Sequence, residues 1–320
     1  MKILLCGQTF PPSRDILSPL LPEDEVIAVP AAQVSEAVAS ADVLIPMMTR
    51  LDVVLIRHTS ARLIQQWGAG LEGVDIDAAS SRGIYVCNVP SDETPNAEST
   101  AEHAVLLMLA CARRLHTCFR AFDKGLWGAP LGDALFGRRA LILGFGRIGR
   151  ALARRLVALG MEVDAIRRRP EPGEAAQTGV REVGTPSDLL RLAAAADFLV
   201  CTATATEEAR GMINASTLHV MKPTAFVINV SRGAVINEPA LIAALKNGLI
   251  AGAGLDVFAQ EPVDLRSPLL RMENVIATPH VAGVTTQSYE GIARAIAANV
   301  TAVKEGRMPQ YCVNPAARPA

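Results

Sequence analysis

Three side chains suited to acid–base and anion chemistry lie in the second half of the chain. Arg232, Glu261 and His280 each come shortly after a run of aliphatic residues with the length of a β-strand. A guanidinium binds carboxylates, an imidazole exchanges protons near neutral pH, and a carboxylate can orient an imidazole. Each residue taken singly is compatible with an ordinary loop. In an open parallel sheet, ligands bind beyond the carboxyl ends of the strands, so we expect the three side chains to converge there.

A glycine-rich loop joins an apolar run to an amphipathic segment at residues 141–149. Its glycines, Gly144, Gly146 and Gly149, have the G-x-G-x-x-G spacing of a dinucleotide-binding loop. The first permits a tight turn, the second lets the backbone approach a pyrophosphate, and the third lets helix and strand pack closely. The helix N-terminus then offers amide groups to the phosphates. The loop therefore predicts a dinucleotide site, the alternative being a glycine-rich turn in an unrelated α/β protein.

The next expected strand ends in three consecutive arginines. Arg167, Arg168 and Arg169 directly follow residues 162–166. In NAD-binding proteins an acidic residue at this strand end holds the ribose hydroxyls, but Asp164 lies too early in the strand to do so. A guanidinium carries a permanent charge and forked donors that suit a 2′-phosphate. We therefore predict NADP(H) in preference to NAD(H). The alternative is a solvated basic turn, with NAD held in some other way.

Short apolar runs alternate with helical patterns along the chain, which predicts an α/β protein with two doubly wound parallel sheets. Expected strands in the first third are residues 3–6, 26–29, 43–47, 63–67 and 85–88. Later expected strands are residues 140–143, 162–166, 198–202, 225–230, 250–255 and 275–278. Helices are expected between the later strands at 147–159, 186–194, 215–220 and 238–246.

A long amphipathic segment, residues 96–119, separates the two series of strands, and its first residues carry helix-initiating chemistry. Residues 287–304 form one more Ala-rich helical pattern, which we expect to pack back on the first domain. We predict a discontinuous, flavodoxin-like substrate domain from residues 1–97 and 286–320. Residues 98–285 are expected to form a Rossmann nucleotide-binding domain.

The overall composition excludes several classes of function. Of the 320 residues, 50% are hydrophobic, and the formal net charge is −1, so a nucleic-acid-binding basic face is not expected. The six cysteines show no metal-ligand spacing, so we expect no metal site, and free cysteines at this density suggest a reducing compartment. No run approaches the roughly 18 apolar residues of a membrane span. We therefore expect a cytoplasmic protein that binds neither nucleic acid nor membrane.

Together with the first-domain segment 66–75, these motifs resemble the D-isomer-specific 2-hydroxyacid dehydrogenase family. The resemblance extends from about Arg62 to Gly283 and includes the loop Gly68-Ala69-Gly70 and the opening of the bridging helix at residues 96–103. It implies transfer of a hydride between NAD(P)H and a small 2-keto acid, such as glyoxylate or hydroxypyruvate, giving a D-2-hydroxy acid. It also implies a homodimer. The arginines after residue 166 resemble those of the NADP-using reductases in this family.

The resemblance assigns roles to the catalytic residues and the substrate loop. His280 would give a proton to the carbonyl oxygen, and Glu261 would hold the other ring nitrogen and stabilise the imidazolium. Arg232 would bind the substrate carboxylate and polarise the ketone. The backbone amides of Gly68, Ala69 and Gly70 would bind the same carboxylate, together with Arg232 and His280. His103, which lies beside apolar residues, is expected to be structural.

Cofactor contacts are expected from the glycine loop and from the strand ends. Asp256 would contact the nicotinamide carboxamide or the adjacent ribose. The full expected set is Gly144, Gly146, Arg147, Ile148, Gly149, Arg167, Arg168, Thr204, Val230, Ser231, Asp256 and Gly283. The sequence departs from many family members at Ala203-Thr204, where they carry Val-Pro, and from the NAD-binding members at Arg167, where they carry Asp.

Two other functions remain compatible with this architecture. One is a dehydrogenase of another small anion, such as phosphite or formate, although a formate-type site is expected to add polar residues that the sequence does not identify. The other is a non-enzymatic NAD(H)-sensing module, like the corepressors that share the fold. The presence of Arg232, Glu261 and His280 together argues against the second function.

Overall fold

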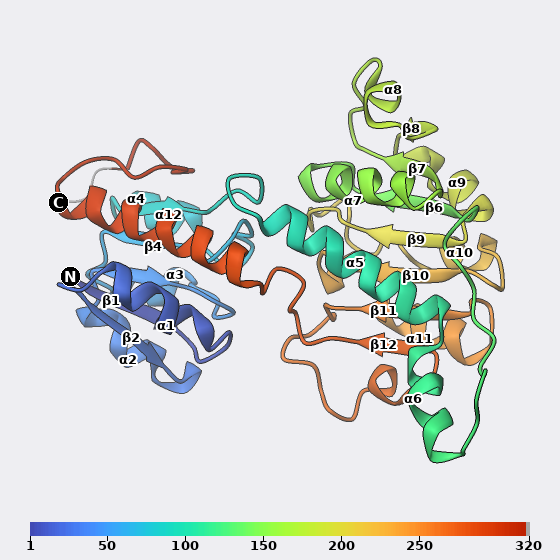
Figure 1. Ribbon diagram of the computed structural model, residues 1–320. Helices are drawn as coiled ribbons and strands as arrows, with labels where there is room; N and C mark the ends of the chain where they lie inside the picture. Colours follow the sequence, from blue (N-terminus) through green and yellow to red (C-terminus); the bar gives the residue numbers. More distant parts are fainter. Residues whose placement is uncertain (318–320) are drawn as a thin grey trace. The chain divides into compact units, whose positions relative to one another are not determined.

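The computed structural model describes residues 1–317, so residues 318–320, the last of the predicted substrate domain, lie outside the described part. The chain divides into two compact units (Figure 1). Unit 1 combines Met1–Asn96 with the C-terminal segment that begins at Thr285, and unit 2 is Ala97–Val284. The assignment of substrate binding to the first unit and nucleotide binding to the second stays a prediction.

Unit 1 contains a five-stranded sheet in which every pair of neighbours is parallel. Its strands are β1 (Lys2–Cys6), β2 (Glu25–Val29), β3 (Val43–Ile45), β4 (Leu63–Gln65) and β5 (Tyr85–Cys87). They lie in the order β2-β1-β3-β4-β5. This is the doubly wound order of flavodoxin-like folds, so the predicted fold of this part is confirmed.

Helices cover both faces of this sheet because successive strand residues point to opposite sides. In β1, Ile3 packs in one buried cluster with Ile296 of the C-terminal helix, whereas Leu4 packs in the other with Ile56. The helices of unit 1 are α1 (Pro12–Leu17), α2 (Val34–Ala37), α3 (Val53–His58), α4 (Ile76–Ser81) and α12 (Thr286–Lys304), with short 3-10 turns at Ser18–Leu20, Ala31–Gln33 and Val38–Ser40. Helix α12 thus completes a core whose strands, β1 to β5, all lie within the first 87 residues of the chain.

Unit 2 contains a seven-stranded parallel sheet with the order β12-β11-β10-β9-β6-β7-β8. The strands are β6 (Arg139–Leu143), β7 (Glu162–Ile166), β8 (Glu182–Gly184), β9 (Phe198–Cys201), β10 (Phe226–Asn229), β11 (Gly252–Leu255) and β12 (Val275–Ala277). The strand order reverses between β6 and β9, which is the point where an open α/β sheet binds a dinucleotide. The predicted Rossmann fold is confirmed.

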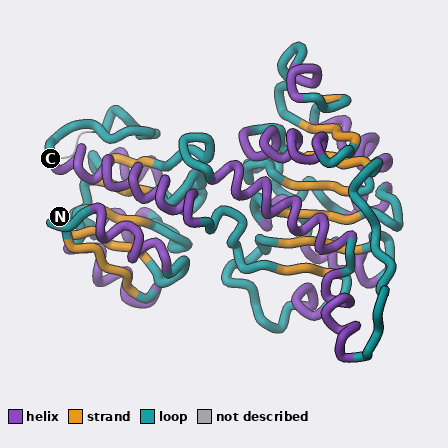
Figure 2. Tube along the Cα trace, viewed as in Figure 1, coloured by secondary structure: helices purple, strands orange, loops and turns teal. Residues whose placement is uncertain are grey.

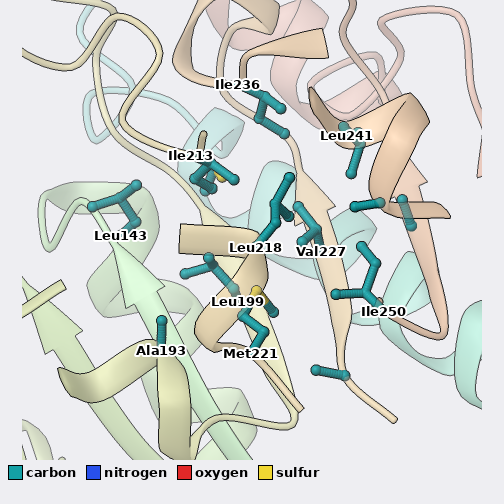
Figure 3. Close-up of a cluster of buried hydrophobic side chains, with 14 of the residues drawn as sticks. Leu143, Ala193, Leu199, Ile213, Leu218, Met221, Val227, Ile236, Leu241 and Ile250 are labelled. Atoms are coloured by element: carbon teal, nitrogen blue, oxygen red, sulfur yellow. The ribbon is translucent and has the colours of Figure 1, made fainter. Parts of the chain in front are cut away.

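In each unit the strands form one layer between helices (Figure 2). In unit 2, Leu199 of β9 and Val227 of β10 pack against Leu218 and Leu241, as Figure 3 shows. Val200, the next residue of β9, joins the cluster on the opposite face. The helices are α5 (Asn96–Ala112), α6 (Leu115–Asp123), α7 (Arg147–Ala158), α8 (Glu174–Thr178), α9 (Leu189–Ala195), α10 (Ala215–Val220) and α11 (Glu238–Lys246), with 3-10 turns at Pro186–Asp188, Gly233–Val235 and Pro268–Arg271.

The predicted single helix at residues 96–119 is wrong. Helix α5 ends at Ala112, and Arg114 adopts a left-handed conformation with φ 52° before α6 begins. A left-handed residue cannot continue a right-handed helix, so the chain changes direction there. The short strand β8 was not predicted, because Glu182-Val183-Gly184 has only one aliphatic side chain and forms no apolar run. Within residues 1–317, no helix has the length and apolar character of a membrane span.

Candidate active site

His280 and Glu261 form a direct hydrogen bond beyond the carboxyl ends of β11 and β12. The His280 Nδ1 atom lies 2.7 Å from the Glu261 Oε2 atom. The other carboxylate oxygen of Glu261 accepts a hydrogen bond of 2.9 Å from the Phe258 amide. A carboxylate held on both oxygens fixes the ring orientation and keeps a proton on Nδ1, which makes Nε2 the nitrogen for proton exchange.

The surroundings of Glu261 favour its charged form. Burial raises the pKa of this carboxyl, but the hydrogen bond and charge of His280, the Phe258 amide and the charge of Arg232 together lower it below the usual value. Glu261 is therefore ionised at neutral pH. An ionised carboxylate beside an imidazole stabilises the imidazolium that a proton donor must form.

Arg232 is brought toward this pair by a close approach of two loops. A Cβ atom at Gly233 would lie 1.9 Å from the carbonyl carbon and oxygen of Phe258, so only glycine fits where the β10 and β11 loops meet. Buried Asn229 shapes the turn before it: its Oδ1 accepts from the amide and hydroxyl of Ser231, and its Nδ2 donates to the Arg232 carbonyl. No motif in the sequence pointed to Asn229.

Asp256 anchors the loop that carries His280. One of its oxygens accepts hydrogen bonds from the Thr278 hydroxyl at 2.6 Å and the Val281 amide at 2.8 Å, and the other accepts from the Ala282 amide at 2.8 Å. His280 has φ 55°, a left-handed conformation that costs about 1–3 kcal/mol and needs firm support. The expected contact of Asp256 with the nicotinamide stays a prediction, whereas its bonds to this loop are present.

His103, on α5, extends this anchor. Its Nε2 atom lies 2.9 Å from the Thr278 hydroxyl oxygen and 3.5 Å from Asp256 Oδ1. Because Thr278 donates its hydroxyl proton to Asp256, the His103 ring must donate to Thr278. Burial lowers the pKa of His103, while the charge of Asp256 opposes the shift. A neutral His103 thus supports the loop that carries His280, a contact that its apolar sequence neighbours did not indicate.

The three glycines of the dinucleotide loop meet different requirements. A Cβ atom at Gly144 would lie 2.4 Å from the Ala203 amide nitrogen, and a Cβ atom at Gly149 would lie 2.3 Å from the Gly144 carbonyl oxygen. Internal packing therefore requires glycine at both positions. A Cβ at Gly146 would have no atom within 4 Å. Gly146 also caps α7 without a side-chain hydrogen bond, and Arg147 and Ile148 form the first turn. The open space and the helix N-terminus fit a dinucleotide pyrophosphate.

Arg167, at the tip of β7, belongs to a cluster of two arginines and two glutamates. Its Nη1 atom lies 2.7 Å from Glu174 Oε1 and 2.9 Å from Glu171 Oε1. Arg150 of α7 approaches the same oxygen of Glu174 at 2.5 Å. Glu174 is 3% exposed, whereas the Glu171 side chain is 63% exposed. Arg168, the next residue, is exposed.

Other predicted cofactor residues lie at the same edge of this sheet. Thr204 follows β9, Val230 and Ser231 follow β10, and Gly283 follows β12. In unit 1, the predicted substrate loop is held through its carbonyls: Gly68 accepts from the Val89 amide and Ala69 from the Asn88 side chain, both at 2.8 Å, and Gly70 follows. Ligand contacts of all these residues stay predictions.

Comparison with known proteins identifies the family. A model described as D-isomer specific 2-hydroxyacid dehydrogenase, NAD binding domain, matches residues 105–282. The chain belongs to the D-isomer specific 2-hydroxyacid dehydrogenase family. The resemblance inferred from the sequence motifs is therefore confirmed.

Similar proteins span nearly the whole dehydrogenase chain. A glyoxylate reductase of Korarchaeum cryptofilum is 38% identical over 290 residues, covering 87% of this chain and 84% of the relative. A glyoxylate/hydroxypyruvate reductase B of Yersinia enterocolitica is 38% identical over 267 residues, covering 82% and 80%. The NADPH-dependent glyoxylate/hydroxypyruvate reductase of Sinorhizobium meliloti, solved with NADP and malonate, has a TM-score of 0.83 and 30% identity, covering 99% and 98%.

This dehydrogenase is thus an oxidoreductase that interconverts small 2-keto acids and D-2-hydroxy acids with a nicotinamide dinucleotide. The predicted reaction class is confirmed. The residues at the carboxyl edge of the Rossmann sheet are compatible with that chemistry, because the His280–Glu261 pair, Arg232 and the predicted dinucleotide loop all belong to one unit.

Proposed function

We propose that this enzyme reduces glyoxylate, hydroxypyruvate or a keto acid of similar size to the D-2-hydroxy acid, with NADPH as the preferred reductant. The observation that carries the proposal is the His280–Glu261 hydrogen bond. It lies beyond the carboxyl ends of the strands of unit 2, the edge of the sheet at which the predicted dinucleotide loop follows β6. Bound NADPH supplies the hydride. Similarity to the glyoxylate and hydroxypyruvate reductases named above supports the substrate class.

His280 holds the proton that the carbonyl oxygen receives. Glu261 accepts the Nδ1–H bond, so Nε2 faces the substrate as the donor, and the negative charge of Glu261 stabilises the protonated ring before transfer. Arg232 binds the substrate carboxylate and polarises the ketone through charge-assisted hydrogen bonds. In the oxidative direction the same imidazole takes the proton from the hydroxyl group.

NADP(H) preference is supported by the arginines beyond β7. Arg167 stands at the position where NAD-binding relatives of this fold place an acidic residue, and exposed Arg168 follows it. A dianionic phosphate gains two permanently charged partners there. The related S. meliloti reductase is NADPH-dependent by name, which agrees with this preference.

A spectrophotometric assay tests the proposal. Oxidation of NADPH is followed with glyoxylate, hydroxypyruvate and pyruvate, and reduction of NADP⁺ is followed with formate and phosphite. We expect turnover with one or more keto acids and a kcat/KM for NADPH at least 10-fold above that for NADH. Turnover with formate or phosphite alone would favour an anion dehydrogenase, and binding without turnover would favour a sensing module.

We also propose a homodimer formed through the surface of α5, α6 and the segment that follows. This region exposes large apolar side chains: Leu106 (52%), Phe119 (63%), Phe122 (70%), Trp127 (85%) and Leu131 (90%). Exposed apolar clusters of this kind mark interaction surfaces. Light scattering should give twice the chain mass, and Phe122→Glu should shift the measured mass toward that of the monomer.

The six unpaired cysteines support the cytoplasm as the location of the protein.

A further inference from the structure

Two cysteines lie opposite each other across an antiparallel bridge in unit 1. Cys87, the last residue of β5, pairs with Cys312 of the C-terminal segment. The Asn88 amide donates to the Tyr311 carbonyl at 3.5 Å, and the Val313 amide donates to the Val86 carbonyl at 2.9 Å. These bonds flank the cysteine pair, so it occupies a non-hydrogen-bonded position. Cα atoms at such positions are about 4.5 Å apart, inside the range that disulfides span.

The two thiols interact directly. Burial raises the pKa of the Cys87 thiol, and the charge of Cys312 and a hydrogen bond with it raise that pKa further. Cys87 is 0% exposed, whereas Cys312 is half-buried. Cys312 is therefore the cysteine that solvent can reach, whereas Cys87 is shielded from solvent.

The backbone on both sides of the pair is already held in place. Asn314 accepts from the Val86 amide at 2.7 Å and donates to the Ile84 carbonyl and the Ser80 hydroxyl, each at 2.9 Å. On the other side, the Gln66 amide donates to the Cys87 carbonyl at 2.8 Å. The backbone therefore holds the two cysteine side chains opposite each other, the arrangement from which a disulfide can form by side-chain rotation.

We propose that Cys87 and Cys312 form a reversible disulfide by exchange with a low-molecular-weight disulfide such as glutathione disulfide. The Cys312 thiolate attacks one sulfur atom of glutathione disulfide and expels the first glutathione thiolate. Cys87 then attacks the Cys312 sulfur and expels the second glutathione thiolate, which takes up the Cys87 proton. One S–S bond breaks and one forms; the protein loses two electrons and two protons, and glutathione disulfide is reduced to two glutathione molecules.

The bond joins β5 to the C-terminal segment through a very long loop of chain. Cross-links that close long loops restrict the unfolded state most strongly, so oxidation should stabilise unit 1. Residues directly after Cys87 hold the Gly68–Gly70 loop through the contacts described above. This exchange involves the two thiols alone and needs neither the keto acid nor the cofactor.

Mass spectrometry of the full-length protein tests the pairing. After incubation with glutathione disulfide and alkylation of the remaining thiols, we expect a peptide pair linked through Cys87 and Cys312, which disappears on treatment with dithiothreitol. The apparent Tm should rise by roughly 5–10 °C on oxidation and return on reduction. Cys118→Ser, which changes a half-buried cysteine of α6, is the matched control and should retain both effects.

Cys312→Ser should abolish both the linked peptide and the rise in Tm. Cys87→Ser should leave Cys312 as a stable mixed disulfide with glutathione, because the second thiol is missing. If Cys87→Ser fails to fold, the Cys312→Ser result still decides the question. Persistent glutathionylation of Cys312 in the wild-type protein, or complete modification of Cys118 with no linked peptide, would overturn the proposal.

Discussion

The buried carboxylate of Glu174 lies 2.7 Å from the guanidinium of Arg167, at the tip of β7. Arg150 contacts the same oxygen at 2.5 Å, and the Glu171 amide donates to the other oxygen at 3.1 Å. The buried carboxylate of Glu174 therefore orients Arg167, and the exposed side chain of Glu171 contacts it as well. Under the proposed NADP(H) preference, the 2′-phosphate shares Arg167 with Glu174 and displaces Glu171.

Arg167→Ala should weaken binding of 2′,5′-ADP by about 10- to 100-fold, because charge-assisted hydrogen bonds contribute roughly 1.5–3 kcal/mol. Binding of 5′-AMP, which lacks the 2′-phosphate, should change little. Isothermal titration calorimetry with the two nucleotides isolates this contribution without turnover. Glu171→Gln is the companion variant and should strengthen 2′,5′-ADP binding, since it removes the competing charge. Equal losses for both nucleotides in Arg167→Ala would contradict the assignment.

The stability of unit 2 should depend on pH through Glu174. Burial raises the pKa of this carboxyl, but the Glu171 amide, Arg150 and Arg167 together lower it below its ordinary value of 4.5. A carboxyl with a lower pKa in the folded state stabilises the protein above its unfolded pKa, and this stability is lost as pH falls through the folded pKa. Between about pH 5 and pH 3, the Tm of Glu174→Gln should therefore fall less with decreasing pH than the Tm of the wild type.

The exposed Glu305 provides the control for the pH experiment, since its variant Glu305→Gln should follow the wild-type curve. Glu174→Gln should also have a lower Tm at pH 7, because two guanidinium groups lose their shared partner. Parallel curves for the wild type and Glu174→Gln would show that the carboxyl does not contribute in this way.

His280→Ala should lower kcat by about 10²- to 10⁴-fold, the usual contribution of a positioned proton donor. NADPH binding, measured by quenching of protein fluorescence, should stay within about 2-fold of wild type, because the phosphate-binding elements are unchanged. Glu261→Gln should keep the ring in place but stabilise the imidazolium less, so its loss in kcat should be smaller. Near-normal turnover of His280→Ala would exclude the imidazole as the proton donor.

Thr278→Val should lower kcat by about 10-fold with little change in NADPH affinity, because it removes the hydroxyl that joins His103 to Asp256. Thr278→Ser preserves the hydroxyl and should restore turnover. Since the contact positions His280, the pH profile of kcat should also shift in Thr278→Val and return in Thr278→Ser. A uniform loss of stability with unchanged kcat in the folded fraction would reduce Thr278 to a structural role.

Much of this architecture follows from local patterns in the sequence. Runs of aliphatic residues with strand length predicted all but one of the strands, because each run buries its own side chains wherever the sheet places it. The glycine spacing of residues 144–149 is also a local pattern, and it predicted the tight turn that joins β6 to α7. The break at Arg114 escaped prediction, because the apolar pattern continues across it.

Contacts between distant segments were decided only by the tertiary structure. The need for glycine at residue 233 comes from the Phe258 backbone, and the partner of His103 lies 175 positions away. The pairing of Cys87 with Cys312 likewise depends on the C-terminal segment returning to β5. A sequence records residue types and local spacing, whereas packing determines which loops meet. The residue types of the candidate site and their places at the strand ends could therefore be read from the sequence, but the groups that hold them in position could not.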